Sequence, residues 1–178
     1  IQFTPSLSSE KQTAMNGGYR YAPSTRIYMQ FQNRFWENES LSGWGNTDIP
    51  EEIWQPTWDL AGSTGIIMSY LRWTPAETMD ALSEEERINY VLNRWESIFP
   101  GATNNLESGV SQSWAEEEWS QGAWASPTSS QDAALASHIG LAEGRIHFAG
   151  EHASDNHGWM QGALFSGLRA ATEINEAN

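Results

Sequence analysis

The sequence predicts a mixed α/β fold in which helices pack against a sheet, and three observations lead to that class. Two apolar runs, at 26–32 and 65–70, have the patterns of strands. Residues 83–98 carry a well-marked helix pattern. The last segment, 145–174, combines a short apolar strand, a polar turn and a helix that contains small residues. That order is typical of α/β proteins, in which such turns bind ligands.

The first half of the chain alternates between polar segments and strands. Residues 1–24 are polar and interrupted by Gly and Pro, with a short helix expected at 8–16. The run 26–32 alternates with period two, as a half-buried strand does. Residues 38–58 are rich in Gly, Pro, Asn and Trp and predict a loop with short strands. The run 65–70 is continuously apolar, which predicts a strand buried on both faces.

The helix predicted at 83–98 has defined ends. Ser83 and Glu86 form a capping-box pattern, in which the hydroxyl accepts the amide of Glu86 and the carboxylate reaches back. Pro100 and Gly101 end the helix. The apolar side chains recur at helical spacing and predict a buried face: Ile88, Val91, Leu92, Trp95 and Ile98.

Shorter elements follow in the second half. They are a strand at 110–117, a loop at 121–127, a short helix at 132–138, a strand at 145–150, a turn at 151–158 and a helix at 159–174. We expect Gly162 and Gly167 to lie on the close-packing side of the last helix.

Composition argues against several classes of protein. The chain has 9 Lys and Arg against 23 Asp and Glu, a net charge of −14, whereas nucleic acids and anionic membranes bind clustered cations. The absence of Cys excludes disulfides, thiolate metal sites and Cys nucleophiles. No apolar run approaches the ~20 residues of a membrane-spanning helix. We therefore expect neither a nucleic-acid partner nor a membrane partner.

The histidines do not form a metal-binding pattern. His147, His152 and His157 recur at intervals of five, with Glu151 beside His152, whereas a helical zinc site needs H-E-x-x-H or H-x-x-E-H. We therefore expect no metal. The G-x-S-x-G elbow and the G-x-x-x-x-G-K-[ST] loop are also absent from the sequence.

Two residues near the final turn suit ligand binding but also have a structural interpretation. Glu151 ends a predicted strand, where a carboxylate can bond sugar hydroxyls in dinucleotide sites, or cap a helix or pair with a cation. Trp159 follows His157 and Gly158, a setting that suits stacking against a flat ring. Most of the ten Trp residues are expected in the core.

The run RIHFAGEHASDNHGWMQGALFSGLRAA, at 145–171, resembles the C-terminal flavin-contacting segment of flavin-dependent amine oxidases, and most of all that of the L-amino-acid oxidases. The similarity continues along the chain in the same order. Its other parts are the F-x-P-P-L-like stretch Phe3–Leu7, with Ser6 in place of the second Pro, the triplet Arg34-Phe35-Trp36, the strand ending at Tyr70, and Trp114 followed by Gly122-Ala123. The resemblance covers essentially all 178 residues and implies the C-terminal part of a two-domain flavin amine oxidase fold.

The resemblance implies FAD as the cofactor. Gly150 and Glu151 would lie beside it, with the Glu151 carboxylate on ribityl or ribose hydroxyls. The backbone of Trp159 and Met160 would approach the N1/O2 edge of the flavin, where a helix N-terminus stabilises negative charge. Trp114 would flank the isoalloxazine.

The resemblance also implies an L-amino acid and O2 as substrates. Tyr70 would donate to the α-carboxylate, and the Gly158 carbonyl would accept from the amine. Trp159 would form a wall of an aromatic cage, and Trp124 would line the side-chain pocket. At Arg26 most relatives carry a Lys that holds a water near flavin N5, so the bulkier, planar Arg leaves the catalytic role of this position open.

Three segments follow from the resemblance: a connecting segment at 1–24, part of the substrate-binding domain at 25–140, and the last strand and helix of the FAD-binding domain at 141–178. The family's G-x-G-x-x-G unit is absent, so we expect other chains of the same precursor to complete the site in a hetero-oligomer. The start at Ile1 and the acidic, Cys-free composition fit a secreted, proteolytically processed enzyme. These features resemble the secreted bacterial L-glutamate oxidases, so L-glutamate is the expected substrate, with Arg72 as a candidate for its side-chain carboxylate.

Two alternatives stay open. The same fold serves amine or polyamine oxidases and amino-acid monooxygenases, although Tyr70 favours a carboxylate substrate. From another class of protein, the ten Trp residues would fit a secreted carbohydrate-binding module. Such a module would be an autonomous β-sandwich without a flavin.

Overall fold

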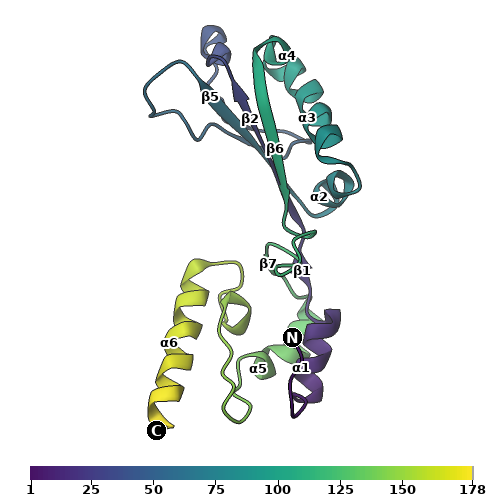
Figure 1. Ribbon diagram of the computed structural model, residues 1–178, viewed down its shortest axis with the longest axis vertical. Helices are drawn as coiled ribbons and strands as arrows, with labels where there is room; N and C mark the ends of the chain where they lie inside the picture. Colours follow the sequence, from purple (N-terminus) through teal and green to yellow (C-terminus); the bar gives the residue numbers. More distant parts are fainter. Residues whose placement is uncertain (178) are drawn as a thin grey trace. The chain divides into compact units, whose positions relative to one another are not determined.

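The chain folds into two compact units, and the computed structural model describes residues 1–177 (Figure 1). One unit is the continuous segment Pro23–Gln121. The other joins Ile1–Ala22 to the segment that begins at Gly122. We call them the sheet unit and the terminal unit.

The borders of the units differ from the predicted segments because two short strands pair near the ends of the sheet unit. β1 (Tyr21–Ala22) and β7 (Trp124–Ala125) form a two-stranded antiparallel sheet, where only a loop is predicted at 121–127. Residues 122–140 therefore group with the termini instead of with the segment at 25–140. The assignment of these segments to substrate and FAD binding stays a prediction.

The sheet unit is built on a five-stranded antiparallel sheet with the order β3-β4-β5-β2-β6. In that order the strands span Gly45–Asn46, Glu52–Trp54, Gly65–Arg72, Ser24–Phe31 and Leu106–Ser113. The strands predicted at 26–32 and 65–70 and the loop with short strands at 38–58 are confirmed. The strand predicted at 110–117 begins earlier, at Leu106.

Helices lie along this sheet (Figure 1). α2 (Trp73–Asp80) packs against β2 and β5, and α3 (Glu84–Ile98) packs against β2 and β6. The short α4 (Ala102–Asn105) packs against α3. The pattern analysis does not predict α2, because its eight residues bury only Ala76 and Met79, too few to set a helical period.

The expectation that the strand at 65–70 is buried on both faces holds only in part. Ile67 and Leu71 of β5 are fully buried on one face; on the other face Met68 is buried, but Ile66 and Tyr70 are half-buried. An antiparallel sheet commonly packs one face on the core and leaves the other open. The second face of β5 is therefore available for another role.

α3 confirms the helix predicted at 83–98, together with its capping box. The Ser83 hydroxyl accepts the Glu86 amide at 3.4 Å, and the Glu86 carboxylate accepts the Ser83 amide at 2.9 Å. The buried face of the helix includes Val91 and Trp95, as its spacing predicts.

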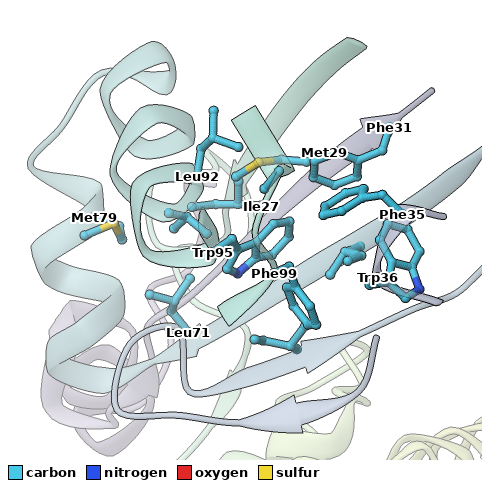
Figure 2. Close-up of a cluster of buried hydrophobic side chains, with 14 of the residues drawn as sticks. Ile27, Met29, Phe31, Phe35, Trp36, Leu71, Met79, Leu92, Trp95 and Phe99 are labelled. Carbon is cyan, nitrogen blue, oxygen red and sulfur yellow. The ribbon is translucent and has the colours of Figure 1, made fainter. Parts of the chain in front are cut away.

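Aromatic side chains fill the core between the sheet and α3 (Figure 2). Trp36, from the 3-10 helix η2 (Phe35–Glu39), and Trp95 are both fully buried. The Phe31 ring centroid lies 5.8 Å from that of Trp36 and 6.0 Å from that of Trp95, within the range of favourable aromatic pairs. Of the ten Trp residues, all of which the structure describes, only these two are buried and six are exposed, so the expectation that most of them lie in the core is wrong. Composition alone cannot separate a buried indole from one at the surface.

The terminal unit contains the remaining helices. They are α1 (Ser9–Thr13), the π-helical turn η1 (Ala14–Gly18), α5 (Ser129–Ile139), the 3-10 turn η3 (Glu151–Ala153) and α6 (Met160–Glu176). They confirm the helices predicted at 8–16, 132–138 and 159–174. The buried Lys11 ammonium ties α1 to α5, because it donates to the carbonyls of His138, Ile139 and Leu141 at the end of α5.

The prediction of a strand at 145–150 is wrong. In this segment only an isolated bridge forms, between Glu143 and Ile146, and no strand of the described residues lies beside it. A strand requires ladder hydrogen bonds to a neighbour, and an apolar pattern cannot supply that neighbour. Side chains of α6 hold the segment instead: Arg169 donates to the Phe148 carbonyl at 2.7 Å, and Ser166 bonds both backbone groups of Gly150.

Candidate functional site

The residues that sequence analysis assigns to a site fall into both units. Arg26, Tyr70 and Trp114 belong to the sheet unit, and the others belong to the terminal unit: Trp124, Gly150, Glu151, Gly158, Trp159 and Met160. The three residues of the sheet unit are far apart in the sequence, whereas in the terminal unit only Trp124 is distant from the others, which lie within 150–160.

In the sheet unit, strand register places Arg26 and Tyr70 side by side. Arg26 of β2 pairs with Tyr70 of β5 and, on its other side, with Gln112 of β6. Cross-strand partners project from the same face of a sheet. The Arg26 guanidinium carbon lies 4.4 Å from the centroid of the Tyr70 ring, and the Tyr70 ring meets the Trp54 ring edge-on at 6.2 Å. This open face thus combines a cation, a phenol and an indole.

Arg26 and Arg72 flank Tyr70 but differ in how their charge is compensated. The Arg72 guanidinium bonds the Glu52 carboxylate at 2.6 Å and lies 3.7 Å from that of Glu51. Within residues 1–177, no carboxylate lies at ion-pair distance from Arg26, and its buried Nε has no hydrogen-bond partner. Arg72 is therefore already neutralised, whereas Arg26 retains a positive charge that can attract an anion.

Trp114 directly follows β6. Its amide donates to the Ser24 carbonyl at 2.9 Å, which extends the pairing of β6 with β2. Its side chain is 39% exposed, so part of the indole can meet another group.

In the terminal unit, Gly150 begins a tightly held turn. Its φ of +148° lies in a region that favours glycine, and a Cβ there would run into the His152 ring. The Gly150 amide donates to Ser166 Oγ at 2.9 Å. The turn is thereby fastened to the middle of α6, through a serine that the sequence analysis did not single out.

The Glu151 carboxylate is held by two backbone amides. One oxygen accepts from Ala125 of β7 at 2.9 Å and the other from Gly158 at 2.6 Å. Each carboxylate oxygen can accept more than one hydrogen bond, so a sugar hydroxyl could still donate to Glu151. The two interpretations of Glu151 are therefore compatible: it shapes the turn and retains capacity to accept from a ligand.

The turn places Gly158 and Trp159 immediately before the first residue of α6. Gly158 has a φ of +75°, and a Cβ there would lie 3.1 Å from the Trp124 ring, so Trp124 and the turn are close neighbours. Trp159 and Met160 are 69% and 84% exposed. No side chain caps the first turn of α6, so its amides and the positive end of the helix dipole are open to an electron-rich group.

The two glycines of α6 differ in environment. A Cβ on Gly162 would collide with Asn156 and Ser154 of the turn, so Gly162 provides the close packing that was expected. A Cβ on Gly167 would meet nothing within 4 Å, so the same expectation is wrong for Gly167. The difference arises because Gly162 shares the buried face of α6 with Ser166 and Ala170, whereas Gly167 lies off that face.

A hydrogen-bonded trio lies behind the turn. The Tyr19 hydroxyl is 3.0 Å from Asp132 Oδ1 and 2.9 Å from His157 Nε2, and the Tyr19 and His157 rings meet edge-on. Burial, together with the hydrogen bond to Asp132, raises the pKa of Tyr19 well above its ordinary value. The sequence gives no sign of this trio, because its members are more than a hundred residues apart or belong to different elements.

Two further observations concern metals and membranes. Among the described residues, no three His, Asp or Glu side chains gather closely enough to hold a metal ion. Within residues 1–177, none of the helices has the length and apolar character needed to cross a bilayer.

Comparison with known proteins gives a consistent result. The family model described as "Flavin containing amine oxidoreductase" matches residues 1–175. The chain is 38% identical over 160 residues to the protein YobN of Bacillus subtilis (strain 168), which covers 87% of this chain and 34% of that protein. It is 35% identical to an L-amino-acid oxidase of Siganus canaliculatus, over 99% of this chain and 34% of the relative. The L-amino-acid oxidase of Vipera ammodytes ammodytes is 29% identical over the whole chain and 38% of that protein.

Solved structures share the fold. Cyclohexylamine oxidase from Brevibacterium oxydans IH-35A matches 99% of this chain and 40% of its own with a TM-score of 0.81 at 19% identity. Putrescine oxidase bound to putrescine matches 99% of this chain and 40% of its own with a TM-score of 0.82 at 22% identity. The chain thus spans between a third and two fifths of the length of each of these relatives. The match excludes the β-sandwich that the carbohydrate-binding alternative requires.

Proposed function

Since the chain belongs to the flavin containing amine oxidoreductase family, we propose that it is the C-terminal part of an FAD-dependent L-amino-acid oxidase. The observation that carries the proposal is the turn at the start of α6. It combines uncapped helix amides, a fixed Gly150-Glu151 corner and an exposed Trp159 beside Gly158. A flat, electron-rich cofactor and a small amine substrate suit such a site.

The residues of the turn fit the flavin by the chemistry they offer. The Trp159 and Met160 amides would face the N1/O2 edge, and the Glu151 carboxylate would bond a sugar hydroxyl with its remaining lone pairs. When bound, FAD would accept the hydride from Cα of the amino acid, whose imino product hydrolyses to the 2-oxo acid and ammonia while O2 is reduced to H2O2. The protein would supply much of the rate acceleration by orienting the substrate against the cofactor.

Each unit offers groups suited to one part of the substrate. Tyr70 would donate its hydroxyl to the α-carboxylate, and the Gly158 carbonyl would accept from the amine. Trp159 would form a wall of the substrate cage, and Trp124 would line the pocket for the side chain. Arg26 lies beside Tyr70 on the same sheet face and has no acidic partner among the described residues.

We propose L-glutamate as the amino acid. Arg26 supports an acidic substrate, because it is a half-buried cation of the open face without an acidic partner among the described residues. Arg72, the cation first considered, has its charge compensated by Glu51 and Glu52. Measuring kcat/KM for L-glutamate, L-glutamine and L-leucine tests this choice, and equal values for all three would contradict it.

The FAD site would be completed by other chains of the same precursor in a secreted hetero-oligomer. An exposed apolar stripe on α6 supports the proposal that another chain packs against this helix: Leu164, Phe165 and Leu168 are 70%, 57% and 66% exposed. Large apolar stripes on a monomer commonly mark an interface. Secretion is supported only by the acidic, Cys-free composition, and detection of the enzyme in the culture fluid of the native source tests it.

The experiment that tests the function is a spectrum followed by a product assay on the enzyme purified with all its chains. The proposal expects flavin absorption, and H2O2, ammonia and 2-oxo acid in equal amounts from an L-amino acid. A colourless protein would overturn it. Turnover of simple amines or polyamines, but not of amino acids, would favour the amine oxidase alternative, and a hydroxylated or decarboxylated product would favour a monooxygenase.

A further inference from the structure

We propose that His157 is a positioning residue for the Gly158–Trp159 turn, and that Tyr19 and Asp132 hold its ring in place. The inference rests on the proposed function, because it assigns these residues to the substrate-amine side of the same site. Its basis is the hydrogen-bonded trio behind the turn.

Three separate parts of the terminal unit converge on one hydroxyl. Tyr19 follows η1, Asp132 lies in the first turn of α5, and His157 lies in the turn before α6. The Tyr19 hydroxyl lies within 3.0 Å of both partners. The trio therefore joins the N-terminal segment and α5 to the residue immediately before Gly158.

The direction of the hydrogen bonds follows from the proton count. An ionised carboxylate only accepts, so the single Tyr19 proton goes to Asp132. The Tyr19 oxygen must then accept from His157, which places a proton on Nε2. The raised pKa of Tyr19 agrees, because burial and the hydrogen bond to a carboxylate both oppose ionisation of the phenol.

The trio supplies the second anchor of the turn. The first is the Glu151 carboxylate, which accepts the Gly158 amide at 2.6 Å. Gly158 has no side chain of its own to restrict it, and it adopts a φ of +75°. Because a glycine rotates easily about both backbone dihedrals, the direction of its carbonyl depends on residues held on either side. The His157 ring, fixed by Tyr19, is one of these.

The consequence concerns the amine of the substrate. In the proposed site the Gly158 carbonyl accepts from that amine, whereas the carboxylate is held elsewhere. Loss of the His157–Tyr19 hydrogen bond should therefore weaken binding of ligands that carry an amine and spare ligands that carry only a carboxylate. A residue that merely stabilises the fold would affect both classes equally.

The test uses the complete flavoenzyme with Tyr19→Phe, His157→Phe and His157→Gln. Gln retains an N–H donor for the Tyr19 oxygen, and Phe does not. Two probes that cannot be oxidised at Cα, 2-aminobenzoate and benzoate, are titrated against the visible spectrum of the flavin. The matched control is His147→Phe, which removes a different histidine hydrogen bond in the same unit, to the Glu173 carboxylate at 2.9 Å.

Tyr19→Phe and His157→Phe should raise the dissociation constant of 2-aminobenzoate about tenfold, equal to ~1.4 kcal/mol, and leave that of benzoate within about twofold. His157→Gln should recover most of the affinity, and His147→Phe should not change it. Unaltered 2-aminobenzoate binding in Tyr19→Phe, or equal weakening of both probes, would overturn the inference while the proposed function stands. A wild-type enzyme without flavin would overturn the proposed function and this inference with it.

Discussion

Replacing Glu151 by Ala should weaken retention of FAD, and the structure gives the size of the effect. The Glu151 carboxylate accepts two backbone amides, from Ala125 at 2.9 Å and from Gly158 at 2.6 Å. A hydrogen bond to a charged group contributes about 1.5–3 kcal/mol. At the low end of that range the two bonds hold the turn by about 3 kcal/mol, and FAD binding would have to supply this free energy to order the turn in the variant. At 1.4 kcal/mol per tenfold, the dissociation constant of FAD should rise about 100-fold.

The assay is titration of the apoenzyme with FAD, followed by flavin fluorescence. Glu96→Ala is the matched control, because the Glu96 carboxylate also accepts two backbone amides, from Gly101 at 2.9 Å and Thr103 at 2.8 Å, but lies in the sheet unit. It should leave FAD binding unchanged. Glu151→Gln tests the direct sugar contact, since its amide can still bond a hydroxyl but turns a donor toward one of the backbone amides. FAD binding by Glu151→Ala within threefold of wild type would refute the reasoning.

The remaining predictions concern α6 and the sheet unit. Gly162→Ala should lower the free energy of unfolding by about 1–3 kcal/mol, because its methyl collides with the turn at Asn156. Gly167→Ala should raise it by up to ~1 kcal/mol, because a methyl there meets nothing and Ala favours a helix over Gly. Urea unfolding measures both changes, and equal effects would contradict the packing of the turn against Gly162. Ser83→Ala should cost about 1 kcal/mol of stability in the same assay and leave kcat unchanged, because it removes only a helix cap. Trp159→Ala should lower kcat/KM about tenfold or more with little change in melting temperature, since the indole is 69% exposed, and unchanged kinetics would contradict the cage assignment.

Local sequence patterns predicted features that are specified within one segment of the chain. The capping box of Ser83 and Glu86 specifies its own helix end, and it is present in the structure. The alternation of 26–32 also predicted a strand correctly, although that strand forms because β5 and β6 pair with it. The helix that begins near Trp159 was also predictable, because its periodicity is contained within one segment.

Features that depend on a distant partner were not predictable. The segment 145–150 has an apolar strand pattern but no neighbouring strand among residues 1–177. The bond between Tyr19 and His157 joins positions 138 residues apart, and no spacing rule relates them. The different charge states of Arg26 and Arg72 follow from which carboxylates the fold brings near them, and the sequence alone favoured Arg72.

The central claim is that the turn before α6 presents its amides to a flavin, and amide hydrogen exchange of the complete enzyme with and without FAD tests it most directly. The account predicts that FAD slows exchange in a peptide covering 157–164, while a peptide from α3 at 84–98, within the helical layer of the sheet unit, exchanges at the same rate in both states. Equal exchange at 157–164 in the two states, with FAD bound, would contradict the claim.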